Sequence, residues 1–147
     1  MRREFQYVFS GVQYPGIPVL NIIPINGDPF VIGDIRLQPI QVMHYKLPVY
    51  GFRIGNFTYI TDANYIAPEE IEKIRGTEIL VLNALRHEPH ISHFTLSEAI
   101  ALAKEIGAAK TYFTHASHQL GLHASLEADL PEGMFMAYDG LQIEINI

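Results

Sequence analysis

The fold is decided by residues 79–118, which read ILVLNALRHEPHISHFTLSEAIALAKEIGAAKTYFTHASH. Residues 79–82 are entirely apolar, which predicts a short buried strand. Thr95, with a glutamate three residues later, forms a capping-box pattern and predicts the start of a helix that ends at Gly107. Residues 111–114 predict the next strand. A strand, a helix and a second strand in this order favour a layered α/β fold with a mixed sheet.

The sequence on either side of this stretch predicts further strands and helices. A two-residue turn at Gly55-Asn56 separates two apolar runs and predicts a hairpin. Pro68 and the two glutamates after it are typical of a first helical turn. We therefore expect strands at 4–9, 17–25, 34–44, 50–54, 57–60, 134–137 and 141–147, and helices at 68–74 and 124–130.

Composition excludes several classes of function. The chain has 147 residues, of which 48% are hydrophobic, so it can build the core of a single domain. Its 10 Lys and Arg against 16 Asp and Glu give a net charge of −6, which excludes a sequence-independent nucleic-acid binder with a broad basic surface. The absence of cysteine excludes disulfides, zinc–thiolate sites and a cysteine nucleophile. No apolar run approaches a membrane span, and we expect a cytoplasmic protein.

The polar residues that follow apolar strands are the candidates for chemistry. Seven histidines are present; one is His44, and the other six lie between positions 87 and 123. His44, Asp62, Asn83 and His115 each come directly after an apolar run. Ligands of open α/β sheets gather at such strand ends, and neutral imidazole is a common metal ligand. Taken singly, each histidine also fits an ordinary surface or core position, and Asp62 fits a turn or helix cap.

Five short motifs occur in order along the chain: YITDA at 59–63, LNALR at 82–86, PHISHF at 89–94, THASH at 114–118 and AYDGL at 137–141. Together they resemble the C-terminal half of metallo-β-lactamase-superfamily hydrolases. The resemblance is closest to the cyclic-phosphodiesterase, or PhnP-like, branch, a relative of the tRNA-processing ribonuclease Z group. It runs from about residue 34 to the C-terminus. It implies an α/β fold, the C-terminal half of an αββα sandwich, with a mixed sheet and helices on one face.

The resemblance also implies a site with two divalent metals, Zn or Mn. By position, His44 would bind one metal, Asp62 would bridge both, and His115 would bind the second. His93 matches the general acid that protonates the leaving oxygen. His118 and His90 would support a ligand or contact the substrate, and His87 and His123 have no assigned role. Two such metals neutralise the charge that grows on phosphoryl oxygens.

One departure from the family is large, because the chain lacks the motif His-x-His-x-Asp-His that supplies the family's other metal ligands. We therefore expect residues 1–147 to be one partial domain without its N-terminal half. The expected parent is a binuclear phosphodiesterase for a small cyclic or nucleotide-like substrate. This chain alone is expected to bind metal weakly or not at all and to be inactive.

Two alternatives stay open at this point. In one, the chain is a metal-free interaction module that forms a homodimer through an exposed sheet face, because a half-sandwich leaves that face uncovered. In the other, the same scaffold hydrolyses an ester, a thioester or a lactone, because one fold can host many reactions.

Overall fold

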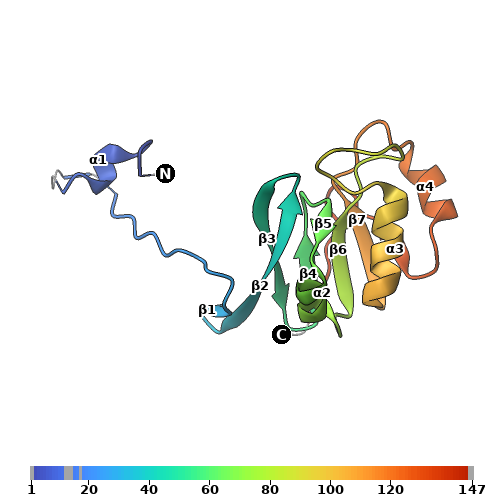
Figure 1. The fold of residues 1–147 in the computed structure, drawn as a ribbon, viewed down its shortest axis with the longest axis horizontal. Coiled ribbons are helices and arrows are strands. Elements are labelled where there is room, and N and C mark those ends of the chain that lie inside the picture. The colour runs from blue at the N-terminus through green and yellow to red at the C-terminus, as the bar shows by residue number, and fades with distance from the viewer. Residues whose placement is uncertain (1, 12–14, 17, 146–147) are drawn as a thin grey trace.

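The computed structural model describes residues 2–11, 15–16 and 18–145. Its centre is one mixed sheet with the strand order β1-β2-β3-β4-β6-β7-β8, and β5 pairs with β2 (Figure 1). The strands are β1 (Phe30–Ile32), β2 (Ile35–His44), β3 (Leu47–Ile54), β4 (Phe57–Ile60), β5 (Tyr65–Ile66), β6 (Ile79–Asn83), β7 (Lys110–Thr114) and β8 (Met134–Met136). The α/β class with a mixed sheet, predicted from the sequence, is confirmed.

The first half of the sheet is antiparallel, and a tight two-residue hairpin connects each pair of successive strands from β1 to β4. Pairing of Ile54 with Phe57 leaves Gly55 and Asn56 as the two-residue turn between β3 and β4, as predicted. Gly55 has φ 57°, a left-handed conformation that suits glycine. Between β2 and β3, pairing of His44 with Leu47 also leaves a two-residue turn.

The second half of the sheet is parallel, with β4, β6, β7 and β8 running in the same direction. Its connections include α2 (Pro68–Ile74), α3 (Leu96–Ile106) and α4 (His123–Asp129). Thr95 caps α3 through a full capping box: its Oγ1 accepts from the amide of Glu98, and the Glu98 carboxylate accepts from the amide of Thr95. Gly107 ends this helix in the left-handed conformation, with φ 74°. The predicted helix and both of its boundaries are therefore confirmed.

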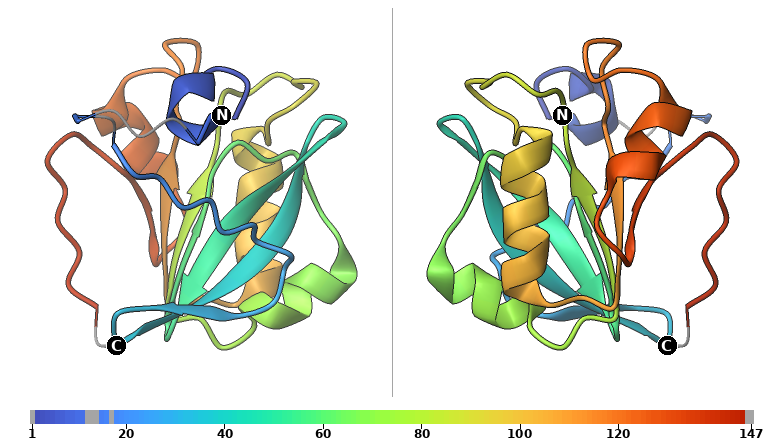
Figure 2. Two further views of the ribbon diagram at one scale, coloured as in Figure 1. Left: turned by 90° about the vertical axis from the view of Figure 1, so that its left-hand side faces the viewer. Right: turned by 90° about the vertical axis from the view of Figure 1, so that its right-hand side faces the viewer.

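The main core lies between the sheet and these helices, which share one face of it (Figure 2). Apolar residues of the strands meet apolar residues of α2 and α3 there. The fully buried members include Ile40, Ile60, Leu80, Leu82, Phe113, Ile74 and Ala99. Burial of such side chains contributes about 25 cal/mol per Å² of apolar surface, so this layer holds the strand ends in place.

The opposite face of the sheet carries aromatic and apolar residues. The strand register places Phe52, Tyr59, Val81, Tyr112 and Phe135 side by side across β3, β4, β6, β7 and β8. The rings of Tyr112 and Phe135 are stacked with centroids 5.3 Å apart, while 43% of Tyr59 is exposed. A groove of about 360 Å³ separates part of this face from residues 141, 143 and 145. This second face is apolar and only partly covered.

Three predicted strands at the ends of the chain are wrong in the part that the structure describes. Residues 4–9 contain the short helix α1 (Gln6–Phe9), and residues 141–145 form no strand, with 146–147 outside the described residues. Residue 17 is also outside them, and 18–25 form no strand, with Val19 87% and Ile23 84% exposed. The apolar patterns are present, but a strand needs a neighbour, and the N-terminal segment leads away from the sheet (Figure 1). No described helix is long and apolar enough to cross a membrane.

Candidate metal centre

The strand ends bring the predicted site residues to one edge of the sheet. Asp62 follows β4 and His115 follows β7, and these strands are parallel to β6 between them. His44 is the last residue of β2, which runs in the same direction as β4 because both are antiparallel to β3. Parallel strands end at the same edge, so the three residues meet there.

The Asp62 carboxylate lies at the centre of this cluster. The Nε2 atom of His93 is 3.2 Å from Asp62 Oδ1, within hydrogen-bond distance, and the Nε2 atom of His115 is 3.6 Å from the same oxygen. The rings of His93 and His115 are stacked with centroids 4.7 Å apart, and the ring of His44 meets that of His93 edge-on at 4.8 Å. Four of the predicted residues therefore form one contiguous group.

The donor atoms of this group fit a divalent metal. One ligand atom each from His44, Asp62 and His93 lie within 4.8 Å of one another. His115 adds a fourth donor next to the same carboxylate. Imidazole nitrogen and carboxylate oxygen are the ligands that Zn²⁺ and Mn²⁺ take in proteins. The distances include His93 in the possible ligand set, although the family resemblance assigned this residue the role of proton donor.

Backbone strain is concentrated at this edge. Among the described residues, three that are not glycine have a positive φ: Tyr45 at 58°, Asp62 at 54° and His115 at 62°. Two of these are candidate metal ligands, and the third directly follows His44. Such conformations cost of order 1–3 kcal/mol each and persist where the surrounding structure enforces them. The strain therefore marks the same edge as the side-chain cluster.

Asn83 holds the loop that carries Asp62. Its side chain is fully buried, and its Oδ1 accepts from the amide of Ala63 at 2.9 Å while its Nδ2 donates to the carbonyl of Ala63 at 2.9 Å. The same carbonyl accepts from the amide of Phe94. The sequence placed Asn83 at a strand end, but nothing in it indicated that this amide clamps the next residue after Asp62.

His93 is buried beside a hydroxyl and a second imidazole. Ser92 Oγ is 2.9 Å from His93 Nδ1 and 3.3 Å from His90 Nδ1. Burial lowers the pKa of the His93 imidazole below its ordinary value of 6.5, and the hydrogen bond to Asp62 opposes this shift. The neighbouring imidazoles of His115, His44 and His90 lower the pKa again.

The four remaining histidines between positions 87 and 123 differ in how they relate to the cluster around Asp62. His90 lies against His93, with ring centroids 5.1 Å apart, so it is adjacent to the cluster through this contact. His118 is exposed, and the described residues include no hydrogen-bond partner for its side chain. His87 and His123 lie close to the carbonyls of Leu120 and Met136. These last two contacts fit a structural role, in keeping with the lack of an assigned function.

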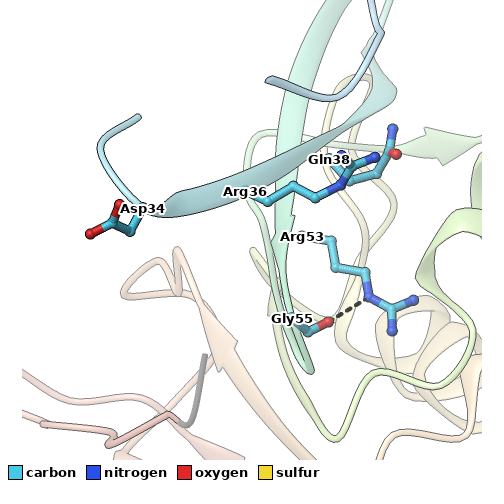
Figure 3. Close-up of a pocket in the computed structure, with 5 residues that line it drawn as sticks. All are labelled: Asp34, Arg36, Gln38, Arg53 and Gly55. Atoms are coloured by element: carbon cyan, nitrogen blue, oxygen red, sulfur yellow. Dashed lines mark hydrogen bonds between the residues drawn. The ribbon is translucent and has the colours of Figure 1, made fainter. Parts of the chain in front are cut away.

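A separate pocket of about 430 Å³ lies along β2 and β3 and contains two arginines, Arg36 and Arg53 (Figure 3). The guanidinium of Arg53 donates to the carbonyls of Gly55, Lys73 and Arg75. These carbonyls belong to the β3–β4 turn and to the end of α2, so Arg53 ties the helix to the sheet. Arg36 lies near the start of β2 and His44 is its last residue, so this pocket lies toward the opposite edge of the sheet from the histidine cluster.

Comparisons with known proteins agree with this geometry. Residues 1–116 match the family model described as the beta-lactamase superfamily domain. The chain is 33% identical to a solved diphosphatase of the PhnP family, with a TM-score of 0.85. It is 18% identical to the short form of human tRNase Z, with a TM-score of 0.62 over 80% of this chain and 45% of that one. The second likeness shows a shared fold.

The chain is also 36% identical over 148 residues to an octanoyltransferase of Porphyromonas gingivalis. Both of the more similar proteins are longer. The matches cover 99% of this chain in each case, but only 54% of the diphosphatase and 30% of the octanoyltransferase.

The Asn83 clamp generates a prediction about stability. Asn83→Ala leaves the buried amide of Ala63 without its acceptor, and we expect the free energy of unfolding in urea to fall by about 1–3 kcal/mol. Asn26→Ala, which removes an exposed asparagine, is the control and should change it by less than about 0.5 kcal/mol. Equal effects of the two substitutions would contradict the clamp.

The lowered pKa of His93 predicts a pH dependence for the metal-free chain. Between that pKa and the ordinary 6.5, the unfolded chain carries a proton on this imidazole and the folded chain does not. Folding stability should therefore decrease as the pH falls through this window, by at most about 1.4 kcal/mol per pH unit. Urea titrations in a chelator should show a shallower decrease for His93→Gln. Parallel curves for the two proteins would refute the assignment.

Proposed function

The chain belongs to the beta-lactamase superfamily, and from this we propose that it is the second half of a binuclear metal-dependent phosphodiesterase. Its substrate is a small cyclic or nucleotide-like phosphodiester. The observation that supports this most is the convergence of His44, Asp62, His93 and His115 at one edge of the sheet. The 33% identity to a PhnP-family diphosphatase adds support for phosphate-ester chemistry.

Three residues are the proposed metal ligands. His44 would hold one divalent ion, His115 a second, and Asp62 would contact both through its carboxylate, which already has imidazoles on two sides. Bound there, Zn²⁺ or Mn²⁺ would activate water and neutralise charge on the phosphoryl oxygens. Residues Asn83 and Ala63 keep the carboxylate in place through the buried amide clamp.

His93 is the proposed general acid. Its Nε2 points to Asp62 and thus into the site, while its Nδ1 is anchored by the hydroxyl of Ser92. A buried imidazole with a lowered pKa gives up its proton readily once protonated, and the departing alkoxide needs that proton. His90, whose Nδ1 is 3.2 Å from His93 Nδ1 and 3.3 Å from Ser92 Oγ, supports the orientation of His93.

The proposed ligand set is incomplete within residues 1–147. Three ligands shared between two ions leave each ion with two, whereas protein zinc sites have three or four. We propose that the rest of the parent enzyme supplies the missing ligands and covers the aromatic second face of the sheet. Alone, the chain would bind metal weakly and be inactive, and two copies would pair through that uncovered face.

Acyl chemistry is a different use of the same scaffold. The octanoyltransferase relative is matched over 30% of its length, so its named activity can reside elsewhere in that protein. Among the residues that the structure describes, no contact at the histidine cluster favours an acyl group over a phosphoryl group. Substrates of both kinds therefore belong in the test.

The test uses the natural polypeptide that carries residues 1–147, loaded with Zn²⁺ or Mn²⁺. We expect hydrolysis of bis-(p-nitrophenyl) phosphate, abolished by a chelator, and a rate reduced about 10²–10⁴-fold by His93→Ala. His87→Ala is the matched histidine control, because His87 is exposed and its ring contacts the backbone carbonyl of Leu120, and the rate of this variant should stay within about twofold of the wild-type rate. A fully active His93→Ala protein, or faster cleavage of p-nitrophenyl octanoate than of the diester, would overturn the proposal.

A further inference from the structure

The turn between β2 and β3 presents an aromatic side chain beside the metal centre. Its first residue, Tyr45, directly follows the proposed ligand His44 and has φ 58°. The amide of Tyr45 donates to the side chain of Asn64 at 2.7 Å, which holds the backbone in this conformation. The ring itself is 48% exposed, so burial in the core does not explain a tyrosine here.

The neighbouring hairpin has a glycine at the equivalent backbone position. Gly55 is the first residue of the β3–β4 turn and has φ 57°, almost the same value as Tyr45. Glycine adopts such angles without strain, whereas a bulky residue does not. The chain therefore uses glycine in the turn at the opposite edge of the sheet and a strained tyrosine in the turn at the site. Strain of this kind is concentrated at functional positions.

Tyr45 lines an open pocket that the proposed metal ligand His44 also lines. The pocket has a volume of about 440 Å³, within the usual range for small-molecule sites, and its lining residues are His44, Tyr45, Lys46, Leu47, Ile91 and Ser92. His44 is a proposed ligand, and Ser92 anchors the proposed acid His93. Leu47 is 60% and Ile91 63% exposed, so both leave apolar surface free beside the ring of Tyr45.

We propose that Tyr45, with Leu47 and Ile91, binds a planar aromatic ring, such as a nucleobase, on the leaving alcohol of the substrate. This inference rests on the proposed phosphodiesterase function and narrows its substrate class. The pocket would hold the leaving alcohol because Ser92 lines it and contacts His93. His93 is the proposed donor of the proton to the leaving oxygen. Lys46, with its ammonium 5.2 Å from the Tyr45 ring centroid, adds positive charge for a phosphate-bearing molecule.

The first experiment compares two substrates that differ only in the ring. In adenosine 2′,3′-cyclic phosphate the base is on the ribose whose 2′ or 3′ oxygen is the leaving group and which stays bonded to phosphorus through the other oxygen. The 2′,3′-cyclic phosphate of methyl riboside has the same diester without a base. In the natural polypeptide, Tyr45→Gly should raise the KM for the adenosine substrate at least about fivefold, which corresponds to the lower end of the stacking free energy of one base. It should raise the KM for the methyl riboside substrate less than about twofold. Tyr45→Phe keeps the ring and should restore the KM. Tyr7→Gly removes an exposed tyrosine that does not line the pocket and should change neither KM.

The second experiment measures binding without turnover, which separates this inference from the proposed function. Adenosine 5′-monophosphate should bind the wild-type protein more tightly than ribose 5-phosphate does, as titrated by NMR, and Tyr45→Gly should abolish that difference. Since glycine suits φ 58°, Tyr45→Gly should melt at no lower temperature than the wild type, so lost binding would not reflect unfolding. Equal affinities of wild type and Tyr45→Gly for the nucleotide would overturn the inference, even in a protein that hydrolyses diesters.

Discussion

The contact on which the site depends is the one between the Asp62 carboxylate and the two imidazoles that face it, His93 and His115. This contact exists because strands β4 and β7 end at the same edge of a parallel sheet. The backbone at Asp62 and at His115 is held in a left-handed conformation, and the buried amide of Asn83 fixes the loop between β4 and β5. The apolar core between the helices and the sheet holds these strand ends in place.

How much of the fold the sequence predicts depends on how local each signal is. The capping box at Thr95, the stop at Gly107 and the turn at Gly55-Asn56 are encoded within a few residues, and all three form as predicted. The segments 4–9 and 141–145 have a strand-like pattern but form no strand. A strand exists only beside another strand, and no short sequence pattern contains that neighbour.

The site likewise combines features that follow from local sequence with features that depend on distant residues. His44, Asp62 and His115 are predictable as strand-end residues, because their positions follow from apolar runs. Three features are not predictable in this way: the contact of Ser92 with both His90 and His93, the amide clamp of Asn83 and the strained backbone at Tyr45. They depend on rotamers and on backbone angles set by residues up to 20 positions away. The family resemblance assigned roles to the histidines, and these roles stay predictions.

The most direct test of this account is a crystal structure of the natural polypeptide that carries residues 1–147, soaked with Zn²⁺ and measured at the zinc absorption edge. The account predicts two ions about 2.0–2.2 Å from their ligands, one on His44 and one on His115, with Asp62 contacting both and His93 bound to neither. Metal that lies elsewhere on the chain, or a single ion bound by His93 with His115 free, would contradict it.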